Sequence, residues 1–175
     1  MGRQAKESRR GEKITLTLGF TDDEKINGDP NRIYPLIISV IFQKHQVGGC
    51  LIDEGNLVDI LYENTFEPVG LKREKMKYCF GLEAIGLNGT NARPWGYVTL
   101  DVTLGEGAGR RTIEIPFLVI LDASTYNCVF GRPTLAALDL VASTVHLKMN
   151  YHSVEGEVVT VHTDLNGVRK LYEIP

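Results

Sequence analysis

One acidic residue of this chain stands where an apolar strand would meet a glycine turn. Asp53 follows Leu51 and Ile52, and Gly55 comes two positions later. A strand fixes the position of such a carboxylate, and the glycine lets backbone N–H groups approach its oxygens, which a side chain would obstruct. Two carboxylates that share one proton can activate a water molecule for attack on a carbonyl carbon, because like charges in contact cannot both be ionised. The segment therefore predicts hydrolysis by an activated water.

The predicted active-site loop is Asp53, Glu54, Gly55 and Asn56, with Asp53 as the catalytic residue. Asp53 is the one aspartate in an Asp-x-Gly frame, so a site with two carboxylates requires two chains related by a twofold axis. We therefore expect a homodimer, and a monomer without activity. The three-residue pattern alone is also open to a simpler interpretation, in which the Asp53 side chain only caps a turn.

Composition and charge limit the classes of protein that the chain can represent. Its 175 residues suggest one domain, and 43% hydrophobic and 23% charged residues are ordinary for a globular protein with a real core. A net charge of −3 argues against a general nucleic-acid or membrane-surface binder. The exception is a basic, polar head within residues 1–30. We expect this head to be a disordered linker, and weak contact with nucleic acid is the less favoured alternative. No apolar run is long enough for a membrane span, so we expect no membrane partner.

The cysteines and histidines predict neither a disulfide framework nor a metal site. Cys50, Cys79 and Cys128 are odd in number and widely spaced, which favours three buried small side chains in a reducing compartment. We therefore expect an intracellular, cytoplasmic protein. The histidines show no paired ligand spacing, so no metal and no cofactor is expected.

Short apolar runs separated by turns predict a mainly β protein. We expect strands at 36–42, 47–53, 95–104, 112–121, 126–130, 142–149 and 158–162, and a last edge strand after the turn at 165–167. Helical turns are expected at 57–66 and 133–140, the second with a proline in its first turn. Close strand spacing with two short helices favours a small closed β-barrel.

Two segments of the chain resemble each other. Residues 50–53 and 128–131 each consist of a cysteine, two apolar residues and a residue at which the expected strand ends. That last residue is Asp53 in the first segment and Gly131 in the second. Each segment precedes an expected helix. Pseudo-twofold duplication would produce this pattern, and chance would produce it as well.

Longer motifs extend this pattern. The landmarks are residues 20–23, 51–55 with 59–62 behind them, 126–135 and 143–149. Together they resemble the retropepsin-like aspartic protease domain of plant Ty3/gypsy-type retroelement polyproteins. The resemblance implies a retropepsin-type barrel that dimerises, one catalytic aspartate per subunit, and an endopeptidase that processes its own Gag-Pol-like polyprotein.

The resemblance divides the chain into three parts. We expect a basic head or linker at 1–30, the retropepsin-like domain at 31–150, and a C-terminal hairpin or polyprotein spacer at 151–175. The flanking parts would then be spacer sequence between the products of a longer polyprotein.

The resemblance also implies a hairpin flap over the cleft. The candidate flap is Gly86, Leu87, Asn88 and Gly89. Its Asn-Gly pair accepts the positive φ angles of a tight turn, and a flap must open for substrate and close to exclude water. The alternative is an ordinary surface hairpin.

Two residues of the loop depart from the family pattern. Glu54 stands where a Thr or Ser hydroxyl usually helps to lock the loops of two subunits, and Asn56 stands where a small residue is usual. The alternative to an active enzyme is therefore a catalytically impaired dimerisation or peptide-binding module of the same fold. By the same resemblance, Gly131 permits tight packing beside the loop and Arg132 supports the dimer or the loop by ion pairing, unless Arg132 is a plain surface arginine.

Overall fold

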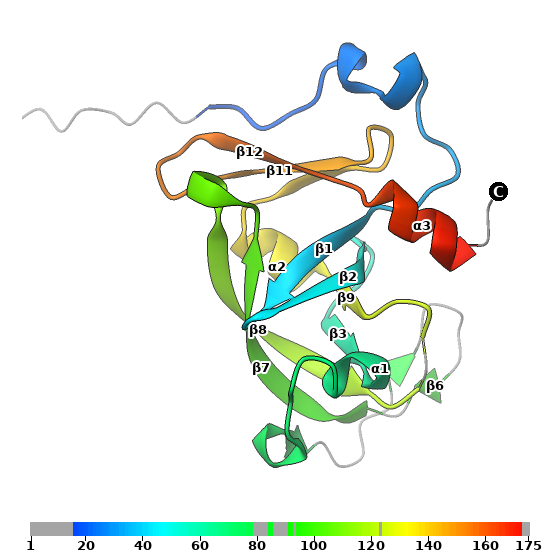
Figure 1. Cartoon of the computed structure of the whole chain (residues 1–175), viewed down its shortest axis with the longest axis vertical. Coiled ribbons are helices and arrows are strands. Elements are labelled where there is room, and N and C mark those ends of the chain that lie inside the picture. Colours follow the sequence, from blue (N-terminus) through cyan, green and yellow to red (C-terminus); the bar gives the residue numbers. More distant parts are fainter. Residues whose placement is uncertain (1–15, 79–83, 86–90, 93, 123, 173–175) are drawn as a thin grey trace, which may run out of the picture.

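Six strands of the chain close into a β-barrel (Figure 1). The structure, a computed structural model, describes residues 16–78, 84–85, 91–92, 94–122 and 124–172. The strands of the main sheet are β1 (Ile37–Phe42), β2 (His45–Ile52), β3 (Asp59–Tyr62), β4 (Lys77–Tyr78), β7 (Pro94–Leu104), β8 (Arg111–Ile120) and β9 (Cys128–Phe130). Their order is β1-β2-β9-β3-β8-β7-β4, and β1 also pairs with β7, so the expected closed, mainly β fold is confirmed.

Two smaller sheets and several short helices complete the described part of the chain. The smaller sheets contain β10 (Val141–Ser143), β11 (Lys148–His152) and β12 (Val158–His162) in one, and β5 (Ala84–Ile85) and β6 (Asn91–Ala92) in the other. The helices are α1 (Glu63–Phe66), α2 (Arg132–Ala137) and α3 (Leu165–Tyr172), with 3-10 turns η1 (Asp22–Glu24), η2 (Ile26–Gly28), η3 (Arg73–Lys75) and η4 (Gly107–Gly109). Within the described ranges, no helix is long and apolar enough to cross a membrane.

Aromatic rings fill the centre of the barrel. Phe42, Phe117 and Phe130 come from three different strands and are fully buried. The ring centroids of Phe42 and Phe117 lie 5.5 Å apart, and those of Phe117 and Phe130 lie 5.9 Å apart, which is the range of favourable edge and tilted contacts. Cys50 and Cys128 are free thiols buried in the same core, as the sequence predicts for both.

Neighbouring strands of the barrel wall are paired over very different lengths. β7 and β8 pair along the length of both strands and form a long antiparallel hairpin. β1 and β7, which close the barrel, pair only at Ile41–Thr103 and Phe42–Val102. Closure therefore depends on a short contact between strands that are far apart in the sequence.

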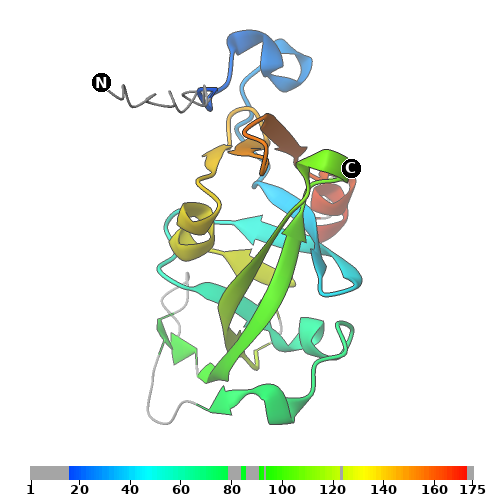
Figure 2. The same cartoon turned by 90° about the vertical axis from the view of Figure 1, so that its left-hand side faces the viewer.

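Residues 16–30 form an arm that runs along the three-stranded sheet at one end of the molecule (Figures 1 and 2). The ring of Phe20 stacks on His146 with the centroids 5.2 Å apart, and His146 Nδ1 lies 2.7 Å from the Ser143 hydroxyl. The Asn150 side chain donates a hydrogen bond of 2.8 Å to a backbone carbonyl of the arm. These contacts tie the described part of the expected head to β10 and β11.

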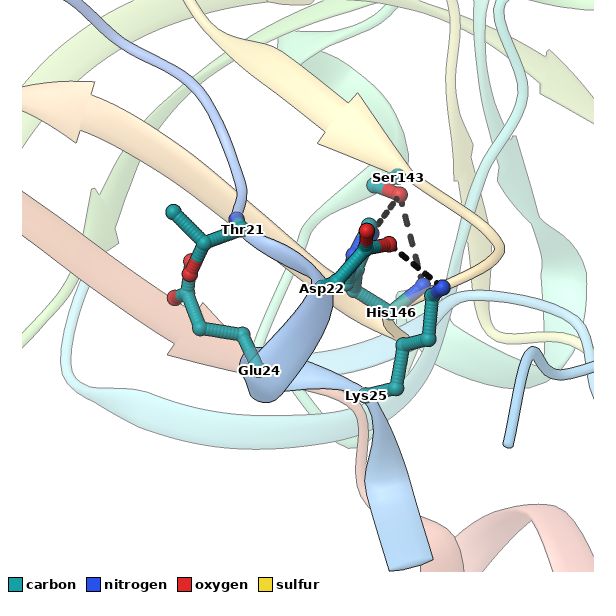
Figure 3. Close-up of polar contacts among 6 residues, drawn as sticks. All are labelled: Thr21, Asp22, Glu24, Lys25, Ser143 and His146. Carbon is teal, nitrogen blue, oxygen red and sulfur yellow. Dashed lines mark hydrogen bonds and ion pairs between the residues drawn. The ribbon is translucent and has the colours of Figure 1, made fainter. Parts of the chain in front are cut away.

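Local polar contacts shape the arm where it meets the β10–β11 turn (Figure 3). The Thr21 N–H and hydroxyl donate to the Glu24 carboxylate at 2.7 and 2.9 Å. Lys25 forms an ion pair with Asp22 at 2.6 Å, and this hydrogen bond and charge lower the pKa of Asp22. The arm thus has its own short-range structure in addition to its contacts with the sheet.

The structure corrects three of the expected elements. The helix expected at 57–66 is confined to α1, because residues 59–62 form β3 between β8 and β9, where tertiary pairing outweighs local preference. The strand expected at 142–149 is divided by a turn into β10 and β11. The expected last edge strand is instead α3, which packs against β1 and β2.

Candidate active site

Asp53 lies directly after the end of β2. Its backbone N–H donates to Phe130 O in β9 at 3.0 Å, which continues the β2–β9 ladder by one step. Its Oδ1 accepts the Gly55 N–H at 2.9 Å, and its carbonyl accepts the Asn56 N–H at 3.1 Å. The backbone of Asp53 is therefore held by β9 and by the turn, and its carboxylate is held by the Gly55 N–H.

The turn brings Gly55 close against this carboxylate. A Cβ atom at position 55 would lie 3.1 Å from Asp53 Oδ1, which is tighter than an ordinary side-chain contact. Asp53 is half-buried, whereas Glu54 and Gly55 are exposed. The turn thus supplies an N–H donor to Asp53 while the Glu54 side chain lies in solvent.

The active-site loop borders a cavity of about 280 Å³. The cavity is lined by Leu36, Ile52, Asp53, Glu54, Gly55, Ala142 and Thr144. Larger cavities of about 440 and 660 Å³ in the described part of the chain are lined by other residues and do not reach the loop. The cavity of about 280 Å³ is the candidate site, because the carboxylate held by the turn lines it.

The end of β9 supports the loop from the side. A Cβ atom at Gly131 would lie 2.6 Å from Val58 O and 2.8 Å from Asn56 O, so a side chain at this position would collide with the loop backbone. The Arg132 N–H, at the start of α2, donates to Asn56 O at 2.9 Å. The Arg132 side chain is exposed and makes no ion pair with any described residue, so ion pairing by Arg132 stays a prediction for the dimer.

Asp59 is a second carboxylate of the site, and the sequence motifs did not assign it a role. It is 2% exposed, and its Oδ1 accepts the Gly131 N–H at 2.7 Å. Burial raises the pKa of the Asp59 carboxyl, and the hydrogen bond from the Gly131 N–H offsets part of that rise. Asp59 therefore positions the start of α2 and is not accessible to a substrate. An acidic residue inside the apolar run 57–62 was the signal for it.

The two similar segments of the sequence are neighbours in the barrel wall. β2 and β9 run parallel and pair at Cys50–Cys128, Leu51–Val129 and Ile52–Phe130. The next residues along the two strands are Asp53 and Gly131. The position beside Asp53 in the wall thus holds a glycine, so this pair of segments supplies one carboxylate per chain.

The candidate flap residues Gly86, Leu87, Asn88 and Gly89 lie outside the described residues. The strands on either side of them, β5 and β6, pair antiparallel. This pairing is common to a flap and to an ordinary surface hairpin, so the role of these residues stays a prediction.

Comparison with solved structures identifies the fold. The retroviral protease-like domain of Ddi1 from Leishmania major is similar with a TM-score of 0.54 at 16% identity, over 77% of this chain and 99% of that chain. A retropepsin-like aspartic protease from Rickettsia conorii gives a TM-score of 0.48 at 17% identity, over 67% of this chain and 91% of that one. EIAV protease in complex with the inhibitor HBY-793 gives 0.44 at 19% identity, over 60% and 88%. The sequence matches no protein-family model and no curated protein.

The chain therefore has the retropepsin-like fold, a closed six-stranded barrel with three short helices among its described residues. The sequence motifs and the barrel agree on the fold class. The barrel carries Asp53 directly after the C-terminal end of β2, beside Gly131, which follows β9.

Proposed function

We propose that the chain is a retropepsin-like aspartic endopeptidase domain, active as a homodimer in which each subunit contributes Asp53. One observation carries this proposal. Asp53 is a half-buried carboxylate at the end of β2, held by the Gly55 N–H and bordering a cavity, in a barrel of the retropepsin-like fold. Peptide or polyprotein segments are the proposed substrates.

The need for a second chain follows from the surroundings of Asp53. Gly131 occupies the neighbouring position in the barrel wall, and Asp59 is buried and bound to the Gly131 N–H. Neither residue can face the Asp53 carboxylate as an equal partner. A twofold axis beside the loop would bring two copies of Asp53 together, which a closed homodimer provides.

In such a dimer the two carboxylates share one proton. The ionised carboxylate accepts a proton from a water molecule as the water attacks the peptide carbonyl carbon, and the protonated carboxyl donates to the carbonyl oxygen. The Gly55 N–H bond to Asp53 Oδ1 stabilises negative charge on that oxygen and fixes its direction.

The retroelement setting belongs to the same proposal. The motifs at 51–55, 126–135 and 143–149 support an origin in a plant Ty3/gypsy-type polyprotein, with the protease domain at 31–150 between a head and a C-terminal part. Residues 86–89 would be the flap. The free thiols of Cys50 and Cys128 support a reducing, cytoplasmic compartment.

A catalytically impaired module that binds peptides or dimerises is the second candidate. Glu54 favours it, because an exposed carboxylate replaces the small hydroxyl that would link two loops. Two copies of Glu54 beside a shared carboxylate pair would also raise the proton affinity of that pair.

Cleavage of a generic peptide library at mildly acidic pH tests the proposal. We expect pepstatin-sensitive cleavage by the wild-type chain and a loss of about 10³-fold in Asp53→Asn, because one general acid–base group contributes about that much. Asp101→Asn is the matched control, since Asp101 is an exposed aspartate on β7 outside the site, and its activity should equal that of the wild type. Equal cleavage by the wild type and Asp53→Asn would exclude the protease.

The substitution Glu54→Thr separates the two candidates. If the fold is an enzyme weakened by Glu54, a hydroxyl able to link the two loops should raise kcat/KM by about two- to tenfold, the worth of one hydrogen bond. No Asp53-dependent cleavage by either chain, with peptide binding retained, would favour the impaired module.

A further inference from the structure

The C-terminal helix α3 packs against β1 and β2, close to Asp53. The Asp53 N–H continues the β2–β9 ladder, and side chains alternate between the two faces of a strand, so Asp53 follows Leu51 where β2 ends. Leu36 and Ile52 line the cavity at Asp53 from the other face of the wall. Leu51 belongs to an apolar cluster on the face that α3 covers, together with Ile37, Val129 and the fully buried Val168 of α3. Figure 1 shows α3, in red, lying beside β1 and β2.

Both ends of α3 are attached on this face. At its start, the Asp164 N–H donates to Ile37 O of β1 at 2.8 Å. At its end, the hydroxyl of Tyr172 contacts the hydroxyl of Tyr126, which lies just before β9. Burial and this contact raise the pKa of Tyr126, and the negative charge of Asp53 contributes to the rise, so Tyr126 lies within electrostatic range of the candidate catalytic carboxylate. The helix therefore extends from β1 to the neighbourhood of Asp53.

A bound substrate would need the same surface. The scissile bond must lie within about 3–3.5 Å of the reacting groups, and an extended peptide rises about 3.3 Å per residue. The second and third substrate residues from the scissile bond would thus lie about 7–10 Å from Asp53. The distance from Asp53 back to Leu51, two residues along the extended chain, is similar. An α-helix of eight residues is about 12 Å long, which is enough to cover that path.

The helix depends on this docking for its existence. Eight residues are fewer than the roughly 12–15 that an isolated helix needs in water, and Gly167 in its interior lowers its helix preference further. On one flank it borders the cavity of about 440 Å³ between α3 and the arm, so the helix is not packed on every side. Exposed Arg169 and Lys170 face away from the docked surface.

We propose that α3 is an internal lid that occupies the peptide-binding face beside Asp53 and must be displaced before a peptide can bind. This inference rests on the proposed function, because the face is a peptide site only if Asp53 acts on peptides. Apparent affinity for a peptide is then reduced by the fraction of chains in which α3 is undocked. Peptides with apolar side chains are the ligands that fit the uncovered cluster of Ile37, Leu51 and Val129.

Binding of pepstatin to the full chain, measured by calorimetry at mildly acidic pH, tests the lid. Val168→Asp places a charge at a fully buried position and should undock α3, which should raise the affinity for pepstatin by about tenfold or more. Asn166→Asp adds the same charge on the exposed side of the same helix and should leave the affinity unchanged. A second variant that ends at Asp164 removes the helix and should reproduce the increase if Val168→Asp fails to fold.

Sedimentation and peptide cleavage separate this inference from the proposed function. An unchanged or lower affinity for pepstatin in both folded variants, or loss of the dimer with loss of α3, would overturn the lid. Failure of every variant to bind pepstatin would overturn it as well. Tighter pepstatin binding without Asp53-dependent cleavage would support the lid and reject the enzyme.

Discussion

β2 and β9 are paired in the same way, but the residues that follow them have different roles. The two strands are parallel neighbours in register, and the paired stretch of each begins with a buried cysteine. At the end of β2 the chain turns outward and presents Asp53 to a cavity. At the end of β9 it enters α2, with Gly131 pressed against the backbone of the loop. One copy of the motif performs chemistry in our proposal, and the other holds it in place.

This difference separates two glycines, Gly55 just after the first segment and Gly131 at the end of the second. Gly55 is exposed and has one close neighbour, the carboxylate of Asp53. Gly131 is buried between backbone atoms that cannot move without moving the loop. Substitution at Gly131 should therefore change stability, and substitution at Gly55 should change the site.

The largest expected effect on stability is that of Gly131→Ala. Its Cβ atom would lie 2.6 Å from Val58 O, so the loop and α2 must separate, at a cost of about 2 kcal/mol in the free energy of unfolding. Urea unfolding measures it. Gly55→Ala is the matched control, with a change below about 0.5 kcal/mol because position 55 is exposed. Equal losses of stability in the two variants would remove the distinction between the two ends.

A smaller effect, with a defined pH dependence, is expected for Asp59→Asn. The folded pKa of Asp59 is raised above 3.8, so the folded state binds the proton more tightly than the unfolded state. The wild type therefore loses stability as the pH rises from 3.8 to the folded pKa, and the variant does not. The loss is about 1.4 kcal/mol for each unit of pKa shift.

Urea unfolding of both chains between pH 3 and pH 7, on the order of half-unit steps, measures the effect of Asp59. The stability of Asp59→Asn relative to the wild type should rise through that window and become constant above it. A constant difference at every pH would mean that folding does not raise the pKa of Asp59.

The smallest effect is expected for Arg132→Ala. The Arg132 backbone N–H holds Asn56 O, whereas its side chain is exposed and pairs with no described carboxylate. The free energy of unfolding of the monomer should change by less than about 0.5 kcal/mol. Sedimentation at several concentrations measures dimer affinity, and a weaker dimer with an unchanged monomer would show that Arg132 forms ion pairs between subunits.

The barrel and the turn that follows β2 could be predicted because their signals are local. Asp53 and Gly55 lie in one short segment, and β7 and β8 are contiguous apolar runs joined by a glycine-rich turn. β3 could not be recognised in the same way, because its strand conformation is set by pairing with β8 and β9, which come much later in the sequence. Asp59 escaped assignment for the same reason, since its partner Gly131 is 72 residues away.

The last helix was missed for a different reason. Leu165, Asn166 and Gly167 have the composition of a turn, and glycine is unfavourable inside a helix. The Asp164 carboxylate accepts the Gly167 N–H at 2.9 Å and satisfies the free start of α3. Burial of Val168 against the barrel wall supplies the remaining stabilisation, and that contact is not visible until the barrel has formed.

The short pairing of β1 with β7 gives the barrel a seam. Only two residue pairs close it, whereas the β7–β8 hairpin is joined along its whole length. Because strands distant in sequence lose the most chain entropy on pairing, this seam should form last during folding and open first in the native protein. Opening there would separate the Ile41–Phe42 end of β1 from β7, while the pairing of β1 with β2 holds Ile37, whose carbonyl accepts the N–H at the start of α3. The wall can therefore open at the seam without undocking the helix.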